Sequence, residues 1–292
     1  MHEWVILSGK GGTGKTSLAA AFATLARAPV MLTDCDVDAA DLHLLIEPEW
    51  GTRIPFFAGY KAHVEETSCV RCGTCQQACR FQAIQSRADG VLAVNAFRCE
   101  GCGSCQTVCP HAAIALTQPQ RGYWQKGIIR FGHFLHAQLD PGAENSGKLV
   151  ALLRREARRL AEEKGCSIMI TDGPPGIGCP VIASLADATQ IVLIAEPSCS
   201  GYHDAERLIL LAKQFACPVS ICVNKWDINP AMTDALHRLA EKAQVHWLGC
   251  IRYSSAFVTA QRKHKTILEI DTAVADDVRQ IWKNMCVHTA YR

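Results

Sequence analysis

Eight of the sixteen cysteines repeat one spacing pattern twice along the chain. The first copy of C-x2-C-x2-C-x3-C begins at Cys69, and the second begins thirty residues later at Cys99. The eight positions are Cys69, Cys72, Cys75, Cys79, Cys99, Cys102, Cys105 and Cys109. Glycine, glutamine, alanine and isoleucine recur at the same offset, which indicates that one small unit has been duplicated and packed against itself. The pattern therefore predicts a compact duplicated domain over about residues 60–120.

This spacing is typical of iron–sulfur ligation, because three thiolates on one tight loop hold three corners of a [4Fe–4S] cluster. The fourth ligand characteristically comes from the other copy of the motif. The expected ligand sets are Cys69, Cys72, Cys75 and Cys109 for the first cluster and Cys99, Cys102, Cys105 and Cys79 for the second. Two zinc sites are the alternative, but zinc ribbons use separated C-x2-C pairs rather than a triple followed by a spaced fourth cysteine.

The duplicated stretch resembles a bacterial-type two-cluster ferredoxin. Pro110 follows Cys109 as that pattern expects, whereas Arg80 takes the place of proline after Cys79. The absence of proline after Cys79 is expected to affect the reduction potential of one cluster more than the presence of that cluster.

Charge and hydropathy exclude several classes of function. Thirty basic and 28 acidic residues give a formal net charge of +2, which provides no field that would recruit nucleic acid or anionic lipid. The first residues lack the basic and apolar regions of a signal peptide, and no apolar run approaches the ~18 residues of a membrane span. We therefore expect a cytoplasmic protein with reduced thiols, no nucleic-acid partner and no direct membrane insertion.

A second motif lies at the start of the chain. The sequence G-x4-G-K-T at Gly9–Thr16 follows a short apolar run, Trp4–Ser8, and precedes an alanine- and leucine-rich helical stretch. This strand–loop–helix context is that of a P-loop, whose backbone N–H groups face phosphates at a helix N-terminus. Lys15 is expected to reach the β- and γ-phosphates, and Thr16 to ligate Mg²⁺. The expected nucleotide-binding residues are Gly11, Gly12, Thr13, Gly14, Lys15, Thr16 and Ser17.

The same G-x4-G-K spacing recurs at Gly142–Lys148. Leu149 replaces the hydroxyl that Mg²⁺ needs, so we interpret this segment as a helix start capped by Ser146, with the helix running to about Glu163. A phosphate contact there is the alternative.

The run K-G-G-T-G-K-T at Lys10–Thr16 resembles the deviant P-loop of the MinD/ParA/nitrogenase-iron-protein/Mrp ATPases. The resemblance implies that Lys10 crosses a dimer interface to the nucleotide of the partner subunit. It also implies that Asp36, in the first switch, positions the attacking water, and that Asp34 lies near the Mg²⁺ shell. Asp172 follows a buried strand run and would hold Mg²⁺ or its water, with residues 173–176 forming the second switch. The implied catalytic residues are Lys10, Lys15 and Asp36, and the implied Mg²⁺ residues are Thr16, Asp34 and Asp172.

Residues 224–227 spell N-K-W-D. In GTPases N-K-x-D reads guanine, whereas the MinD-like resemblance makes Asn224 an adenine contact. We expect ATP, with GTP as the alternative.

Strand and helix patterns alternate through residues 190–223, which points to an α/β fold with a mostly parallel, doubly wound P-loop sheet. The ferredoxin-like α+β domain, residues 60–120, would be inserted into an ATPase domain formed by residues 1–59 and 121–292. The chain end carries an amphipathic helix without a polybasic face, so we expect it to pack on the core rather than on a membrane.

These features together predict an iron–sulfur ATPase that couples Mg-ATP binding and hydrolysis in a dimer to electron transfer or docking onto a redox or metal-cofactor partner protein. The dimer would form with an identical chain or with a paralogue. An ATP-dependent factor that assembles or delivers a metal cofactor is one alternative, although no C-x-x-C follows Cys109. A spatial organiser with redox-sensing clusters is another. Cys35 and Cys179 lie beside the switches, where a redox or metal role is the less common alternative to a structural thiol.

Overall fold

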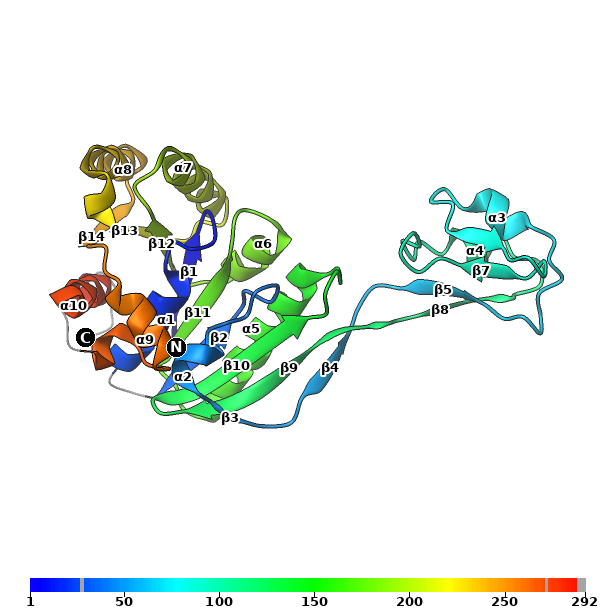
Figure 1. Cartoon of the computed structure of the whole chain (residues 1–292), viewed down its shortest axis with the longest axis horizontal. Coiled ribbons are helices and arrows are strands. Elements are labelled where there is room, and N and C mark those ends of the chain that lie inside the picture. The colour runs from blue at the N-terminus through cyan, green and yellow to red at the C-terminus, as the bar shows by residue number, and fades with distance from the viewer. Residues whose placement is uncertain (27–28, 271–272, 288–292) are drawn as a thin grey trace. The chain divides into compact units, whose positions relative to one another are not determined.

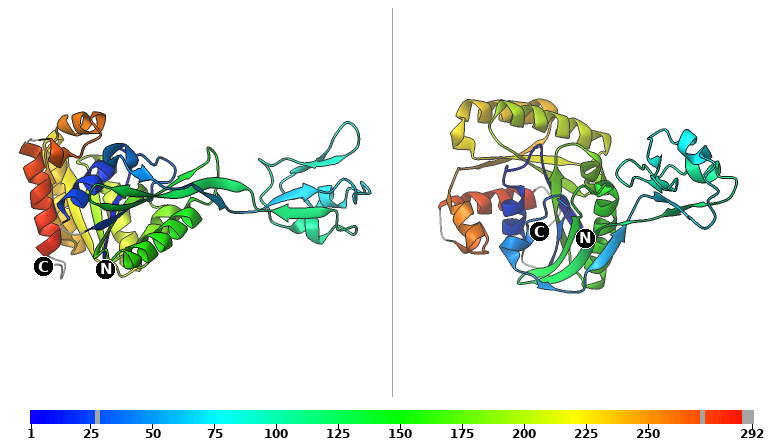
Figure 2. Two further views of the ribbon diagram at one scale, coloured as in Figure 1. Left: turned by 90° about the horizontal axis from the view of Figure 1, so that it is seen from below. Right: turned by 45° about the vertical axis from the view of Figure 1, so that its right-hand side comes forward.

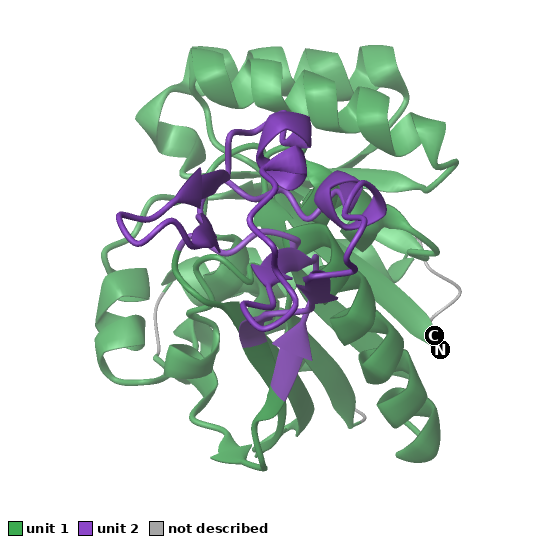
Figure 3. Ribbon diagram, turned by 90° about the vertical axis from the view of Figure 1, so that its right-hand side faces the viewer, with its two compact units in different colours: residues 1–54, 123–141, 146–292 green, residues 55–122, 142–145 purple. Residues whose placement is uncertain are grey.

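The computed structural model describes residues 1–26, 29–270 and 273–287. The chain forms two compact units (Figure 3). The larger unit comprises residues 1–54, 123–141 and the described residues from 146 onward, and the smaller unit comprises residues 55–122 and 142–145. The boundaries expected from sequence, at 59/60 and 120/121, lie within a few residues of these limits, and the short segment 142–145 was not expected in the smaller unit.

A ten-stranded sheet runs through the larger unit in the order β14-β13-β12-β1-β11-β2-β10-β9-β3, with β4 paired to β9 (Figure 1). Every pairing recorded among the strands from β14 to β10 is parallel, and β3 pairs antiparallel with β9. The strands are β1 His2–Ser8, β2 Val30–Asp34, β3 Glu49–Trp50, β4 Ile54–Phe57, β9 Gln120–Ile129, β10 Gly132–Leu139, β11 Ile168–Pro175, β12 Gln190–Ala195, β13 Val219–Asn224 and β14 His246–Ile251. The mostly parallel α/β fold expected from the sequence is therefore confirmed.

Helices cover both faces of this sheet (Figure 2) because its central strands are apolar on both sides. In β1, Trp4 and Ile6 pack into one core with α1 and α10, while Val5 and Leu7 pack into a second core with α6, α7 and α8. The helices are α1 Lys15–Leu25, α2 His43–Ile46, α5 Ser146–Glu163, α6 Cys179–Leu185, α7 Cys199–Gln214, α8 Pro230–Ala243, α9 Ala256–Arg262 and α10 Ala273–Val287, with short 3₁₀ turns at Trp226–Ile228 and Ile267–Glu269.

The smaller unit shows its internal repeat in the structure. One strand pair joins β5 Lys61–Val64 to β8 Ile114–Thr117, and another joins β6 Ile84–Ser86 to β7 Leu92–Val94, both antiparallel. The two short helices, α3 Thr74–Ala78 and α4 Ser104–Thr107, each follow a left-handed glycine at the same repeat position. The core of the unit also repeats, because the equivalent pairs Ala83/Ala113 and Ile84/Ile114 are all buried.

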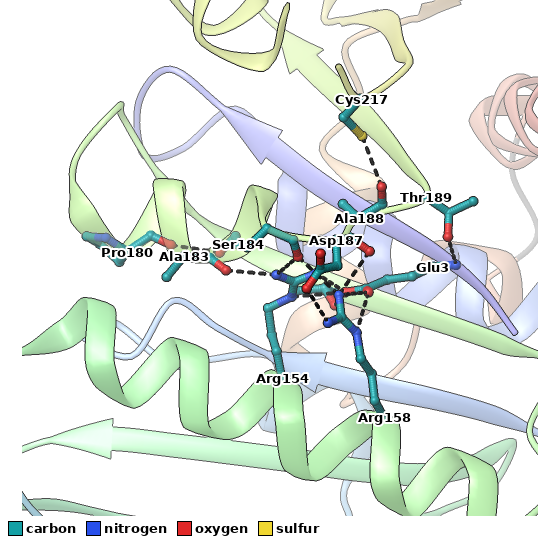
Figure 4. Close-up of polar contacts among 12 residues, drawn as sticks. Glu3, Arg154, Arg158, Pro180, Ala183, Ser184, Asp187, Ala188, Thr189 and Cys217 are labelled. Carbon is teal, nitrogen blue, oxygen red and sulfur yellow. Dashed lines mark hydrogen bonds and ion pairs between the residues drawn. The ribbon is translucent and has the colours of Figure 1, made fainter. Parts of the chain in front are cut away.

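A buried ion-pair network joins β1, α5 and α6 (Figure 4). The carboxylate of Glu3 accepts hydrogen bonds from Arg154 Nη2 at 2.7 Å and from Arg158 Nη2 at 2.7 Å. Arg154 Nη1 also donates to the carbonyl oxygens of Ala183 and Ala186, at 2.7 and 2.6 Å. Since Glu3 and Arg154 are only 2% and 3% exposed, the geometry must satisfy nearly all of their hydrogen-bonding capacity. The network fixes the C-terminal end of α6 against α5.

Three local details of the larger unit bear on the sequence predictions. Helix α5 begins at Ser146, so Ser146 is the first helical residue and not the cap that was expected; the residue before the helix is Asn145, which has a φ of 79°. In α10, Val274, Val278 and Ile281 are buried, as expected for a core-packing helix. None of the helices in the described part of the chain combines the length and apolarity that crossing a bilayer requires.

Candidate nucleotide and iron–sulfur sites

The P-loop joins the end of β1 to the start of α1, and its backbone requires glycine. Gly14, immediately before α1, has a φ of 96°, a conformation that side chains with a Cβ rarely adopt. A Cβ at this position would also lie 2.5 Å from Asn224 Nδ2. The loop and the first turn of α1 line a cavity of about 310 Å³ through Gly12, Gly14, Lys15, Thr16 and Ser17. Five of the seven P-loop residues predicted to bind nucleotide therefore line one cavity, whereas Gly11 and Thr13 are not among its lining residues.

Three aspartates approach the P-loop lysine from the ends of neighbouring strands. Asp34 in β2 and Asp172 in β11 are register partners and are fully buried. Lys15 Nζ lies 3.8 Å from Asp36 Oδ2. The Asp34 carboxylate accepts hydrogen bonds from the backbone N–H groups of Leu42 and Asp36, each at 3.2 Å. The parallel sheet therefore brings together four of the predicted catalytic and Mg²⁺ residues at its carboxyl edge.

Burial dominates the electrostatics of these carboxyl groups. It raises the pKa of Asp172 to about 8, against an opposing effect of the Lys15 charge and with an added upward effect from Asp34. Burial likewise raises the pKa of Asp34 well above its ordinary value, and backbone hydrogen bonding from Leu42 opposes that shift. For Asp36, burial raises the pKa and Lys15 opposes the shift. The site therefore brings together carboxyl groups whose ionised form a bound cation would stabilise.

The carboxylate of Asp172 fits a cation site. Its two oxygens are buried and have no hydrogen-bond partner within normal distance and angle limits among the described residues, and the neighbouring Thr16 hydroxyl lowers the pKa of this carboxyl group. Buried polar atoms are normally paired, and carboxylate oxygens are the ligands that Mg²⁺ prefers. Asp172, Asp34 and the Thr16 hydroxyl are the residues that would hold Mg²⁺ directly or through its water.

We expect Asp172→Asn to stabilise the protein when neither Mg²⁺ nor nucleotide is present. A carboxyl whose pKa is raised in the folded state lowers stability as the pH rises from about 4 to about 8, and the amide lacks this penalty. The gain in unfolding free energy at pH 8 should be about 1–3 kcal/mol, and smaller at pH 5. Thermal melting at both pH values measures it. We also expect Asp172→Asn to lose the Mg²⁺-dependent stabilisation by nucleotide. If Asp172→Asn melted at a lower temperature than wild type at pH 8 without Mg²⁺, the cation-site interpretation would be contradicted.

Lys10 is not directed toward these carboxylates. Its ammonium forms an ion pair with Glu196 and donates to Ser200 Oγ at 3.1 Å. Lys225 Nζ lies 3.8 Å from the other Glu196 oxygen, so two lysines share this carboxylate. In the single chain Lys10 is therefore held beside the end of β12 rather than with Lys15 and Asp36.

Asn224 at the end of β13 lies against the P-loop. Its Nδ2 donates to the carbonyl oxygen of Thr13 at 2.8 Å, and Lys225 Nζ donates to that of Gly12 at 2.8 Å. Both residues line the cavity. The rest of the cavity wall was not predicted from the sequence; it consists of Asp41, Leu45, Arg252, Tyr253, Ser254, Phe257, Val258 and Gln261. The only available signal was that residues 252–254 follow another strand of the parallel sheet.

The eight motif cysteines of the smaller unit line two cavities, with four cysteines in each. One is lined by Cys69, Cys72, Cys75 and Cys109. The other is lined by Cys79, Cys99, Cys102 and Cys105. These are the two sets expected from the spacing, each with its fourth cysteine from the other copy of the repeat.

The surroundings of the thiols are nearly equivalent in the two cavities. The backbone N–H groups of Ala83 and Ala113 donate to the sulfurs of Cys79 and Cys109, each at 3.3 Å. One cysteine of each set, Cys72 or Cys102, is exposed, and a neighbouring hydroxyl hydrogen bond lowers its pKa. Each of the two cavities brings together the four thiols that one [4Fe–4S] cluster requires.

Cys35 and Cys179, the two cysteines expected beside the switches, differ in their exposure. Cys35 is fully buried, and burial raises the pKa of its thiol well above the ordinary value, which describes an inert core thiol. Cys179, at the start of α6, is exposed.

Comparison with known proteins agrees with both sites. Residues 62–116 match the 4Fe-4S dicluster domain family. The chain also superposes on the cell-division ATPase MinD of Pyrococcus furiosus, with a TM-score of 0.59, 13% identity and 99% of each chain covered. A second solved structure, MinD of Pyrococcus horikoshii OT3 complexed with Mg-ADP, gives a TM-score of 0.58 at 14% identity, covering 97% of this chain and 95% of that one. The chain thus has the P-loop fold of the MinD/ParA proteins with a 4Fe–4S dicluster domain inserted in it.

Two relatives in Methanocaldococcus jannaschii are similar over most of their length. The uncharacterized protein MJ0578 is 34% identical over 227 residues, which cover 77% of this chain and 78% of the relative. The uncharacterized protein MJ0579 is 25% identical over 236 residues, covering 78% and 83%. The chain belongs to the family of MJ0578.

Proposed function

We propose that this protein is an ATPase whose nucleotide cycle controls the docking or electron transfer of its own iron–sulfur domain. The observation that carries the proposal is the order of the sites along one chain. The dicluster domain lies between the Asp34–Asp36 segment and the Asp172 segment, the two segments that face the nucleotide phosphates in the proposed site.

In the proposed site, the P-loop amides and Lys15 bind the β- and γ-phosphates of ATP, and Asn224 lies on the base side. Mg²⁺, when bound, neutralises phosphate charge, and Thr16, Asp34 and Asp172 hold it. Asp36 then accepts a hydrogen bond from the attacking water and orients it toward the γ-phosphorus. Its carboxylate lies 3.8 Å from the ammonium of Lys15, a residue that lines the cavity.

Lys10 completes the site of a partner subunit in this proposal. To do so it leaves Glu196, Ser198 and Ser200, its partners in the single chain. Phosphate charge on the opposing nucleotide provides the competing ligand. The similarity of this chain to both MJ0578 and MJ0579 of one organism supports a pairing with either an identical or a related chain.

The smaller unit supplies the redox part of the proposed function. Each [4Fe–4S] cluster, when bound, exchanges one electron. The exposed cysteines Cys72 and Cys102 give each cluster one ligand at the surface, through which a partner protein reaches it. The remaining ligands are more enclosed, which restricts solvent access.

An anaerobic redox titration followed by EPR tests the coupling. The protein is titrated without nucleotide, with Mg-ADP and with a non-hydrolysable Mg-ATP analogue. We expect about eight irons per chain and two interacting [4Fe–4S] signals. We also expect the analogue to shift a midpoint potential or the inter-cluster coupling, because nucleotide must bind two states differently to drive a change.

The matched control is Lys10→Ala, which leaves the P-loop and all eight motif cysteines in place. This variant should still bind nucleotide but lose the shift and any ATP-dependent dimerisation seen by analytical ultracentrifugation. Spectra and association that are indifferent to the nucleotide in the wild-type protein would refute the coupling.

Cofactor delivery is the second candidate, favoured by the surface position of Cys72 and Cys102. A delivery factor would lose iron and sulfide to an apo-acceptor in an ATP-dependent manner. An electron donor would keep about eight irons per chain through repeated oxidation and reduction.

A further inference from the structure

The two copies of the cysteine repeat have equivalent cores but different flanking residues. Two arginines and two phenylalanines flank the cysteines of the second cavity, the one lined by Cys79, Cys99, Cys102 and Cys105. We call these four residues the arginine–phenylalanine surface: Arg80, Phe81, Phe97 and Arg98. The equivalent positions thirty residues away, which flank the first cavity, carry Pro110, His111, Thr67 and Ser68. Phe81 and His111 line the second and the first cavity respectively, in agreement with this equivalence.

The two arginines of this surface are free to bind a partner. Arg80 and Arg98 are exposed, and neither guanidinium has an ion-pair or hydrogen-bond partner among the described residues. Other exposed arginines of the smaller unit are engaged, because Arg71 donates to a backbone carbonyl oxygen at 3.2 Å and Arg87 pairs with Glu66 at 3.4 Å. An unpaired guanidinium is suited to bind the carboxylates of another protein in charge-assisted pairs.

Phe97 is held at the surface by a fixed turn. Its side chain is 99% exposed. Asn95 Oδ1 accepts hydrogen bonds from the backbone N–H groups of Phe97 at 2.9 Å and of Arg98 at 3.3 Å. The N–H of Asn95 in turn donates to the carbonyl oxygen of Ala83 at 2.7 Å, which ties this turn to the segment that follows Phe81. An exposed ring on a fixed backbone loses little conformational freedom on binding, so it is suited to anchor a partner.

The charges beside the second cavity are mostly positive. Lys61 adds a third cation to the two arginines, because its ammonium donates to the carbonyl oxygen of Cys99. The acidic residue that lines this cavity is Glu100. Glu65 and Glu66 precede the first cysteine of the other set. A partner that approaches the second cavity therefore meets more positive than negative side chains, which favours an acidic protein.

We propose that the arginine–phenylalanine surface docks an acidic redox protein, which exchanges electrons with the second cluster. Phe97 enters an apolar pocket of that protein, and the two arginines pair with carboxylates at the rim of the pocket. One electron passes in each encounter, so the reduced cluster returns to its oxidised state and the redox centre of the partner is reduced. The inference rests on the proposed function, because it requires the clusters of the smaller unit, and it adds the docking surface and the class of partner.

Stopped-flow electron transfer to flavodoxin, an acidic one-electron acceptor, tests the surface. The full chain with its clusters is reduced anaerobically, freed of reductant and mixed with oxidised flavodoxin. One electron from a reduced cluster and one proton from solvent convert the flavin to its neutral semiquinone, which is followed by absorbance. We expect the second-order rate constant to fall at least about tenfold between ~0.01 M and ~0.5 M salt, because salt screens the attraction between opposite charges.

Three variants separate the charged and apolar parts of the surface. Arg80→Glu/Arg98→Glu should lower the rate constant at low salt at least about tenfold and remove most of its salt dependence. Phe97→Ala should lower it about tenfold at every salt concentration. Arg71→Glu/Arg87→Glu, the matched control, makes the same change in net charge outside the surface and should stay within about threefold of wild type.

Iron content and midpoint potentials separate docking from damage to the clusters. Every variant should hold about eight irons per chain. Negative charge added beside a cluster disfavours its reduced state and so increases the driving force for electron donation. Slower transfer by Arg80→Glu/Arg98→Glu therefore reports docking and not a changed potential.

Several outcomes overturn the proposal. One is a rate constant that rises with salt, and another is a control variant that slows transfer as much as Arg80→Glu/Arg98→Glu does. Self-association of the wild-type chain that Arg80→Glu/Arg98→Glu abolishes would assign the surface to a second copy instead. If the expected rates were found but the clusters did not respond to nucleotide, the coupling to ATP would be refuted and the surface would stand. A chain that assembles no clusters refutes both.

Discussion

Replacing Lys15 with alanine is expected to lower the rate of ATP hydrolysis by at least about 100-fold. The side chain is 5% exposed and lies beside Asp36, and its charge opposes the rise in pKa of both Asp36 and Asp172. Without it, Asp36 and Asp172 lose the nearby positive charge that stabilises their ionised forms. Phosphate release under saturating Mg-ATP measures the effect.

The chain contains its own control for this experiment. Lys148 ends the second G-x4-G-K sequence but is an exposed residue in the first turn of α5. Lys148→Ala should therefore leave hydrolysis unchanged. If Lys148→Ala abolished hydrolysis and Lys15→Ala left it within tenfold of wild type, the nucleotide site would have been assigned to the wrong loop.

Paired cysteine substitutions should separate crossed ligation from local ligation of the clusters. Each single replacement of Cys75, Cys79 or Cys109 by alanine should reduce the iron content from about eight to about four per chain. The double variant Cys75→Ala/Cys109→Ala should still hold about four irons, because both residues line the same cavity. The double variant Cys75→Ala/Cys79→Ala should hold almost none, because Cys79 lines the other cavity. Iron and sulfide assays after anaerobic reconstitution give the counts.

Local ligation reverses the two double variants. If each four-cysteine motif bound its own cluster, Cys75→Ala/Cys79→Ala would keep about four irons and Cys75→Ala/Cys109→Ala would keep almost none. Since each double variant removes two thiols from the same small unit, general instability affects both alike, and the contrast between them reports the ligand sets.

The elements that could be predicted from the sequence are those whose residue pattern lies within one short stretch of the chain. Strands β1, β12 and β13 are short apolar runs next to glycine or polar residues, and α1 follows a complete P-loop. The cysteine sets were predictable because a [4Fe–4S] cluster imposes its own spacing on the chain. In each case one short stretch carries the whole signal.

The strands β9 and β10 were not predicted. Polar residues such as Gln125 and His136 are buried in them, so neither alternates in the way that identifies a strand facing solvent on one side. The wall at residues 252–261 was missed for another reason. It reaches the P-loop only through tertiary structure, and the hydrogen bond from Tyr253 to Asp227 links segments that share no motif.

The network around Glu3 also limits how this sequence can change. Replacing Glu3 alone would leave the buried guanidinium of Arg154 without its carboxylate, and replacing Arg154 alone would remove the donor to the carbonyl oxygen of Ala183 and leave Ala186 with Arg158 only. Each single loss carries a cost of about 3–5 kcal/mol, while a joint replacement by apolar residues of similar volume is often neutral. These positions are therefore expected to show strong epistasis. Substitutions at Glu3, Arg154 and Arg158 should appear together or not at all in descendants of this chain.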